Sequence, residues 1–404
     1  MRVFLHTMYY LPDFGSAPVL MDELARGLAA AGHEVEVVTT MPRERGEEFR
    51  GLFYSRRDAG GFTVKRFWAP ATPRPLGRLL AWNVYTAGAL VNLLSVRPGD
   101  VLFLRTPPLQ LGLPAFLART LGRARVLVNV QDIHPDLAIE SGILRNPAGI
   151  AFAKALERWV YGLADRIAVI SDDFARNLRG KGVPERKIAL LPNWVDTDAV
   201  RPGPKDNPVA RRHGLAGKFV VMYSGTISIS SDRALGRALE AAKLLSGEPD
   251  VLFVVVGEGL RKEAVRERAA ALGLGNVLFL PFQPYRDLPA LLASSDVLLV
   301  PLDRGKSDLS VPSKLYTFMA AGRPVLGLAA PGSEVAALLR ERDCGVAAPP
   351  DDPAAIAAAV RGLAASPDRR RALGLNARAY VVERFAKDKV LRDYDMLLRS
   401  MVAR

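Results

Sequence analysis

The second half of the chain alternates strictly between short apolar runs and longer segments with helical spacing. The runs are rich in valine and leucine, and they are FVVMYSG, VLFVVVGEG, NVLFLPF, DVLLVP and PVLGLA. Runs this short and this apolar are typical of strands buried on both faces of a parallel sheet, where each crossover is a helix. The alternation therefore predicts an open α/β sheet.

The first half shows the same alternation. Residues 2–8 form a β-rich apolar run, a turn contains Gly15, and a segment with helical spacing ends at Gly32. Further runs follow as VEVVTT, VLFLRT, ARVLVNVQD, DRIAVIS and KIALLPN. We expect a second parallel sheet, with a ligand crevice at the carboxyl ends of its strands, where Gly15 and Ser16 lie.

A length of 404 residues suggests two domains, each with its own core. The segment 200–212 is rich in proline and charge, as an interdomain linker should be. We therefore expect an N-terminal Rossmann-like domain over 1–199 and a C-terminal one over 200–382. The remaining residues, 383–404, contain a helix over 387–402 that could cross back to the first domain.

The stretch 307–325 predicts a helix whose start suits an anion. Ser310 can cap the helix, Pro312 fits its first turn, and Gly322 followed by Pro324 ends it. The N-terminus would then present three polar residues, Ser310, Ser313 and Lys314. Oriented amides and a lysine suit a phosphate or diphosphate. The alternative is a capped surface helix with a solvated lysine.

The net charge of +13 indicates an anionic partner, either an acidic membrane or a phosphorylated ligand. Nucleic acid is disfavoured because no Lys/Arg block is present and aromatics make up only 7% of residues. The single cysteine, Cys344, excludes an internal disulfide and suits a reducing cytosol. The four histidines have no ligand-like spacing, so we expect no metal site. The first residues indicate a strand rather than a signal peptide, and we expect a cytoplasmic protein.

Residues 79–96 contain no charge over about the length of a membrane span. Polar residues within this run favour a helix buried against the sheet. A second interpretation is a helix in a membrane surface, since Arg74, Arg78 and Arg97 flank an apolar face with Trp82 and Tyr85. On that interpretation the protein would be peripheral at the inner face of the cell membrane. A true span is the third interpretation.

Three short motifs give little support to other chemistries. Gly257 and Gly259 follow a strand, but Lys262 stands where a dinucleotide fingerprint has its third glycine. The chain has no GxxxxGK[ST] motif, which disfavours a P-loop ATPase. The DTD sequence at 196–198 could be mistaken for a metal-binding motif, but a turn with a helix cap explains it better.

Two carboxylates follow predicted strands, one in each domain. Asp132 comes directly after the strand VLVNV, with His134 nearby, and Glu334 follows Gly332 and Ser333 at a helix start. Each could be a simple turn or helix cap. Their joint position at carboxyl ends of strands favours a functional role.

The chain contains, in this order, the segments GSAP, ADRIAVIS, LLPNWVD, YSG, VVVGEG, PFQPYRDLPALLASSDVLLVP, VPSKLYTFMAAGRPV and GSE. This ordered set closely resembles the GT-B glycosyltransferases of family 4, within the bacterial branch that includes L-fucosamine transferase-like enzymes of surface-polysaccharide synthesis. The resemblance implies two Rossmann-like domains that face each other across a cleft. It also implies a nucleotide-sugar in the C-terminal domain, an acceptor in the N-terminal domain, and a last helix that returns to the first domain.

The chain departs from the family pattern at its charged positions. The two family glutamates align with Leu309 and Thr317, so both are missing. The arginine and lysine that clamp the diphosphate in the family fall on Thr226 and, with a one-residue shift, Arg233. An arginine can still bind phosphate bidentately. The family histidine falls on Gln131, which leaves Asp132 as the nearer ionisable group.

We therefore expect a retaining, hexosyltransferase-type glycosyltransferase without a cofactor or metal. Its donor would be a nucleoside diphosphate sugar, UDP-linked, and its acceptor a saccharide, carried on a lipid at an anionic membrane surface. The expected catalytic residues are Asp132 and Glu334. The expected donor-binding residues are Gly15, Ser16, Gly225, Arg233, Glu258, Phe282, Tyr285, Ser310, Ser313, Lys314, Gly332 and Ser333. The alternatives are an inactive nucleotide-sugar-binding or scaffold protein and a nicotinamide-dependent oxidoreductase.

Overall fold

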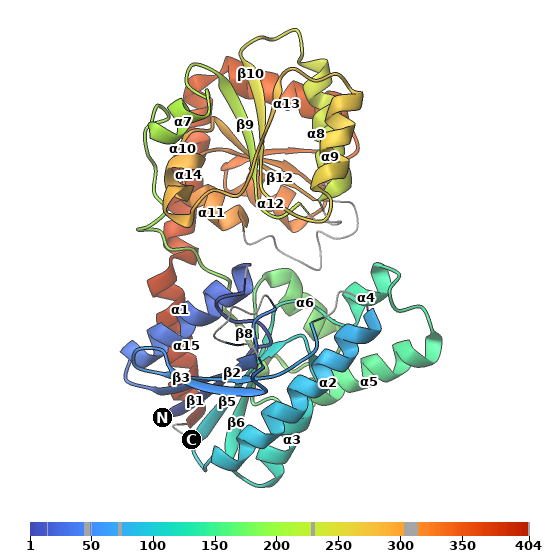
Figure 1. Cartoon of the computed structure of the whole chain (residues 1–404), viewed down its shortest axis with the longest axis vertical. Coiled ribbons are helices and arrows are strands. Elements are labelled where there is room, and N and C mark those ends of the chain that lie inside the picture. Colours follow the sequence, from blue (N-terminus) through green and yellow to red (C-terminus); the bar gives the residue numbers. More distant parts are fainter. Residues whose placement is uncertain are drawn as a thin grey trace. The chain divides into compact units, whose positions relative to one another are not determined.

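The computed structural model describes residues 1–402 except 14, 44–48, 50, 72–74, 228–230 and 303–313. The chain divides into two compact units (Figure 1). The first comprises Met1–Asn193 with Asp388–Arg404, and the second is Trp194–Lys387.

The first unit contains an eight-stranded sheet in the order β3-β4-β2-β1-β5-β6-β7-β8. All neighbouring strands are parallel except β3 and β4. The strands are β1 (Arg2–His6), β2 (Glu34–Thr40), β3 (Tyr54–Asp58), β4 (Thr63–Phe67), β5 (Asp100–Thr106), β6 (Ala124–Val130), β7 (Arg166–Val169) and β8 (Ile188–Leu190). The α-helices are α1 (Ser16–Ala30), α2 (Pro75–Asn92), α3 (Gly112–Thr120), α4 (Asp136–Glu140), α5 (Pro147–Leu163), α6 (Asp172–Gly180) and α15 (Lys387–Val402), and short 3-10 turns lie at Leu93–Ser95, Leu109–Leu111 and Glu185–Lys187.

The antiparallel hairpin β3–β4 at the edge of this sheet is absent from the sequence prediction. Its turn is closed by Asp58, whose carboxylate accepts hydrogen bonds from the amides of Gly60 and Gly61. The strands themselves are charged, with three of five side chains basic or acidic in β3, because an edge strand faces water. A search for apolar runs therefore passes over them.

The second unit contains a six-stranded, wholly parallel sheet in the order β11-β10-β9-β12-β13-β14. Its strands are β9 (Phe219–Ser224), β10 (Val251–Val256), β11 (Val277–Leu280), β12 (Val297–Pro301), β13 (Val325–Leu328) and β14 (Gly345–Ala348). Its α-helices are α7 (Pro208–Arg212), α8 (Asp232–Leu244), α9 (Lys262–Ala271), α10 (Leu288–Ala293), α11 (Lys314–Ala320), α12 (Glu334–Glu341), α13 (Pro353–Ala365) and α14 (Pro367–Phe385), and a 3-10 turn lies at Tyr285–Asp287. The strand–helix alternation expected from the sequence is confirmed.

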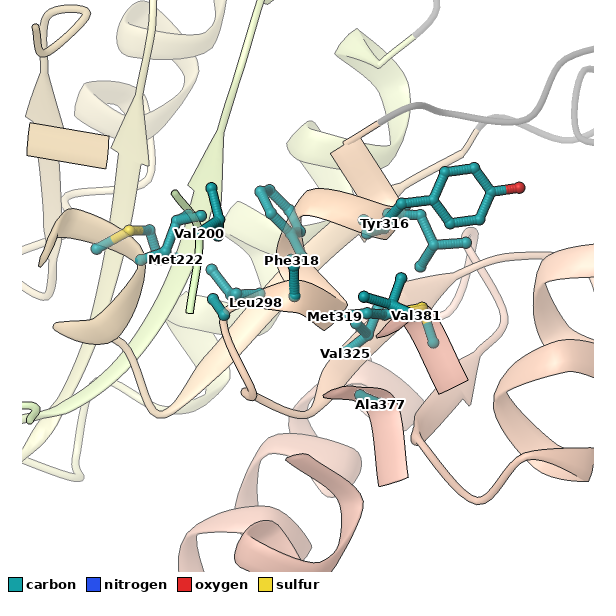
Figure 2. Packing of buried hydrophobic residues seen from close by; sticks show 14 of the residues in the cluster. Val200, Met222, Leu298, Tyr316, Phe318, Met319, Val325, Ala377 and Val381 are labelled. Atoms are coloured by element: carbon teal, nitrogen blue, oxygen red, sulfur yellow. The ribbon is translucent and has the colours of Figure 1, made fainter. Parts of the chain in front are cut away.

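Alternate residues of β9 enter two different hydrophobic cores, one on each face of this sheet. Val220 and Met222 join the core formed with α11 and α14, which Figure 2 shows around Phe318. Val221 and Tyr223 join the core formed with α8 and α13. Because successive side chains of a strand point to opposite faces, both faces of the sheet need an apolar covering. The side chain of Tyr223 thus leaves the strand on the α8 face.

The last helix, α15, packs on the first unit. A Cβ added at Gly27 would lie 2.8 Å from Leu391, so α1 and α15 are in close contact at this glycine. The ring of Tyr394 lies 6.0 Å from that of Phe103 in β5. The fold class expected for this chain, with a C-terminal helix on the N-terminal domain, is therefore confirmed.

The limits of the units differ by a few residues from the expected 1–199, 200–382 and 383–404. Val195 pairs with Ala386, donating its amide to Phe385 at 3.0 Å and accepting from the amide of Lys387 at 3.0 Å. This short pairing ties the residues just before 200 and just after 382 into the second unit. The proline-rich segment 200–212 consequently belongs to the second unit as well.

Candidate active site

Lys314 lies at the carboxyl end of β9 in the second unit. Its Nζ donates a hydrogen bond to the hydroxyl of Tyr223 at 2.8 Å and lies 4.2 Å from the centre of the same ring. A Cβ added at Gly225 would be 2.8 Å from this Nζ, so the ammonium also lies against the backbone of that glycine. Burial lowers the pKa of Lys314 to about 8. At neutral pH the group therefore carries a charge that is costly to bury.

Tyr223, which the sequence prediction did not include, is the residue that contacts the ammonium of Lys314. Its hydroxyl donates to the carbonyl of Thr226 at 2.6 Å, and burial raises its pKa to about 12. Within the described part of the chain no carboxylate is paired with Lys314, and burial alone accounts for its pKa shift. Tyr223 thus holds a cation that has no protein anion beside it in the described residues.

The loops after β9 and β10 run side by side. The amides of Gly225 and Ile227 donate to Val256 and Glu258, both at 2.9 Å. A Cβ at Gly257 would lie 2.0 Å from the Gly225 carbonyl oxygen, and Gly259 is equally crowded by Ile227. Both glycines also have φ near +149°, which side chains rarely adopt. The GEG motif is therefore explained by contact between loops and not by a dinucleotide.

Four other expected donor-binding residues occupy exposed positions of the second unit. Arg233 lies in the first turn of α8, and Glu258 pairs with Lys262 at 2.6 Å. Phe282 and Tyr285 follow β11 with half or more of their surface exposed. These residues remain predicted contacts, whereas Gly225 and Lys314 of the predicted set lie in direct contact.

The segment Gly332–Glu334 begins α12 after β13. Ser333 caps the helix by accepting a hydrogen bond from the amide of Ala336 at 3.3 Å. Glu334 is the first residue of the helix and is partly buried. Its carboxylate adds to the effect of burial in raising the pKa of Tyr316 above its usual range, so it lies near α11. The N-terminus of α12 and the helix of Lys314 are thus neighbours.

Four of the predicted donor-binding residues are not among the residues described around Lys314. Ser310 and Ser313 lie outside the described residues. Gly15 and Ser16 form the exposed start of α1 in the first unit, where Gly15 is the N-terminal cap position with φ of 126°. Their predicted role with the donor remains a prediction.

Asp132 follows β6 at the carboxyl end of the first sheet. Burial raises the pKa of its carboxyl group to about 6, and the nearby guanidinium of Arg105 opposes this rise. Burial also lowers the pKa of His134, whose ring lies edge-on to Trp82 at 6.2 Å. A carboxyl group with a pKa near 6 can accept a proton from a hydroxyl at neutral pH.

A chain of buried amide side chains lies beside Asp132. Asn193 donates to Gln131 at 3.0 Å, Gln131 donates to Asn129 at 2.9 Å, and Asn129 donates to the Tyr394 hydroxyl at 3.0 Å. These hydrogen bonds connect β6, the segment after β8 and α15. Gln131, which replaces the family histidine, is therefore held by hydrogen bonds from both sides.

The DTD sequence at 196–198 forms a turn. The carboxylate of Asp196 accepts hydrogen bonds from the amides of Asp198 and Ala199 and is paired with Lys387. The carboxylate oxygens of Asp196 are therefore engaged by groups of the protein itself. In the residues that the structure describes, no group of three or more His, Cys, Asp or Glu side chains could hold a metal ion.

The uncharged run 79–96 forms most of α2 and the turn after it, and only one of its faces is buried. Tyr85 is fully buried and donates to the Val38 carbonyl at 2.7 Å, whereas Leu80, Val91 and Leu94 are exposed. Helix α3 contacts both α2 and α5. Further exposed apolar residues lie on α3 and α5, namely Leu113, Phe116, Leu117, Phe152 and Trp159. Helix α2 is therefore not wholly buried. No helix in the described residues is long and apolar enough to cross a membrane.

The GT-B class of glycosyltransferases is defined by two α/β units, each built on a largely parallel sheet, and by a last helix that packs on the first unit. Family models match both units: the glycosyl transferase 4-like domain over residues 15–194, and the glycosyl transferases group 1 domain over residues 218–366. Together they cover more than half of the chain. The chain therefore belongs to the GT-B glycosyltransferases of family 4 and is a hexosyltransferase-type enzyme, which replaces the oxidoreductase interpretation.

Individual relatives agree with this assignment. The chain is 28% identical to a protein of Escherichia coli K12 described as the colanic acid biosynthesis glycosyl transferase WcaI, over 98% of both chains. It is 30% identical to the glycosyltransferase WbjE of Pseudomonas aeruginosa over 65% of both chains. Its fold is similar to that of Anabaena HepE, with a TM-score of 0.72, 18% identity and coverage of 99% of this chain and 100% of that chain.

Proposed function

We propose that this enzyme transfers a sugar from a UDP-linked donor to a saccharide acceptor in surface-polysaccharide synthesis. The observation that supports the donor most directly is the buried ammonium of Lys314, held by Tyr223 with no carboxylate partner among the described residues. A diphosphate would supply the missing anion. Hydrogen bonds to charged groups are stronger than neutral ones in such buried places.

Departure of UDP develops negative charge on the diphosphate. Lys314 and Arg233 would stabilise this charge, together with amides at the start of α12. Arg233 is exposed in the first turn of α8, and the amides of α12 begin behind Ser333. Fixed cations and amides need little rearrangement as charge develops, which is why they favour the transition state.

On the acceptor side, Asp132 would orient or deprotonate the attacking hydroxyl. Its raised pKa leaves it ionised at neutral pH but basic enough to take a proton. Glu334 is the second proposed catalytic carboxylate. The family resemblance implies that the transfer retains the configuration at the anomeric carbon.

The relatives support the donor and the pathway by analogy. HepE has been determined in complex with UDP and with UDP-glucose. WcaI is described as an enzyme of colanic acid biosynthesis. The two matches cover 98% and 99% of this chain.

We further propose that the acceptor is carried on a lipid and that the first unit docks on an anionic membrane surface. The exposed apolar residues of α2, α3 and α5 would enter the headgroup region. Exposed basic residues accompany them, namely Arg78, Arg97, Arg119, Lys154 and Arg158. The net charge of +13 adds a general attraction to acidic lipid.

The donor proposal is tested by measuring the thermal unfolding of the protein with UDP, GDP, their sugars and NAD. A ligand that binds only the native state raises the melting temperature. UDP compounds should raise it, and stabilisation by NAD alone would contradict the proposal. Release of free sugar or a transferred product from a bound UDP-sugar then separates an enzyme from an inactive binding protein.

A further inference from the structure

Arg105 is a largely buried cation without a hydrogen-bond partner among the described residues of the first unit. It lies next to the end of β5, and its Nε is buried without a hydrogen-bond partner. Burial lowers the pKa of the guanidinium, as expected for a charge that is poorly solvated. Within the described residues neither a carboxylate nor a carbonyl is bonded to this side chain. A buried charged group without hydrogen bonds is costly and calls for an explanation.

The groups around Arg105 act on its charge without bonding to it, and the nearby carboxylate of Asp132 favours the charged form. Asp132, Tyr394 and Tyr9 interact with it electrostatically, but no ion pair or hydrogen bond connects them to it. The neighbouring amides of Asn129 and Gln131 are engaged with each other and with Tyr394 and Asn193. The guanidinium therefore keeps donors available beside Asp132.

We propose that Arg105 binds an anionic group of the acceptor, either a phosphate or a carboxylate. A guanidinium presents two parallel N–H donors that match the oxygens of both groups. Bound there, the anion would anchor the acceptor next to Asp132, the group proposed to act on its hydroxyl. This inference rests on the proposed function for the identity of the bound molecule, and it defines the acceptor as an acidic saccharide or a saccharide phosphate.

The test measures the binding of inorganic phosphate and of glucuronate by calorimetry. Both are titrated into the full chain carrying Lys314→Ala, which removes the cation proposed for the donor. One or both anions should bind, and adding Arg105→Gln should weaken this binding about tenfold or more. Adding Arg56→Gln, the same change at an exposed position of β3, should leave the affinity unchanged. Selective binding of phosphate indicates a saccharide phosphate, and selective binding of glucuronate an acidic sugar.

A second variant and a second readout guard against a simple loss of folding. Arg105→Lys keeps the charge but not the paired donors, so it should bind the anions several-fold more weakly while melting near the parent. Arg105→Gln should also move the acid limb of the activity profile to higher pH, because Arg105 lowers the pKa of Asp132. The inference would be overturned if Arg105→Gln left anion binding unchanged, or if neither anion bound to the Lys314→Ala chain that still contains Arg105. UDP binding is measured separately with the wild-type chain. A failure of the donor proposal can therefore be distinguished from a failure of the proposal for Arg105.

Discussion

The ammonium of Lys314 donates to the hydroxyl of Tyr223 at 2.8 Å, and that hydroxyl donates in turn to the carbonyl of Thr226 at 2.6 Å. The first residue of α11 is thereby connected to the end of β9 and to the loop behind it. The contact places the ammonium beside Gly225, at the start of the loop after β9.

Replacing Lys314 with alanine should weaken binding of a UDP-sugar by about 1.5–3 kcal/mol, the range for a hydrogen bond to a charged group. Tyr223→Phe keeps the ring and should cost less, about 0.5–1.5 kcal/mol. The two losses should not add, because the residues are in contact. Calorimetry on both single variants and the double variant measures this, with Lys218→Ala at an exposed ion pair as the control. Equal affinity in wild type and Lys314→Ala would contradict the diphosphate role.

The affinity for UDP should fall as pH rises through about 8, where Lys314 loses its proton in the free protein. Lys314→Arg stays charged and should show no such fall if it still binds UDP. Stability should move in the opposite direction. The unfolded lysine binds its proton up to about pH 10.4, so between pH 8 and that value the unfolded state holds more protons, and the free energy of unfolding should rise with pH. Denaturant titrations at several pH values check this, and Lys314→Met should remove the rise.

Asp132→Asn should lower kcat by about 10²–10⁴, the usual contribution of a general base. In the wild type, activity should fall as pH drops below about 6, where the carboxylate becomes protonated. Because its folded pKa exceeds 3.8, the native state holds more protons between these values, and stability should decrease as pH rises through this window. Asp132→Asn should therefore be far less active and, at pH 7, more stable than the wild type. The control is Asp250→Asn at an exposed position. Full activity of Asp132→Asn would exclude Asp132 as the base.

Transfer should persist in excess EDTA. The proposed cations and helix amides can meet the phosphate charge without a divalent ion, and Asp196 is engaged by two backbone amides and Lys387. The check is a comparison of initial rates with and without EDTA. Activity that disappears and returns with Mg²⁺ or Mn²⁺ would restore Asp196 and Asp198 as candidate ligands.

The protein should float with vesicles that contain acidic lipid, and binding should weaken as salt rises. Each arginine near an acidic surface contributes about 1 kcal/mol, and the exposed apolar face adds a burial term. Arg78→Glu with Arg97→Glu should reduce binding, whereas Arg340→Glu with Arg371→Glu, the same charge change on exposed sites of the second unit, should reduce it much less. No flotation even at low salt would end the membrane proposal and leave the glycosyltransferase assignment intact.

The sequence alone determined the two parallel sheets, because strands buried on both faces must be almost wholly apolar, as VLFVVV and VLLVP are. It also indicated Lys314 and Asp132, which stand at the carboxyl ends of strands or at a helix start, where polar residues interrupt the pattern. It missed the charged hairpin β3–β4, since an edge strand in water needs no apolar run.

Only the tertiary structure decided which side chains work together. Tyr223 and Arg105 lie inside strands, where the sequence pattern marks them as part of an apolar run. Tyr223 gains its role from Lys314, ninety-one positions further along the chain. Arg105 stands out because folding buries it near Asp132 and Tyr394 without giving it a hydrogen bond in the described residues. Hydrogen bonding and burial depend on neighbours distant in sequence, so spacing along the chain cannot reveal them.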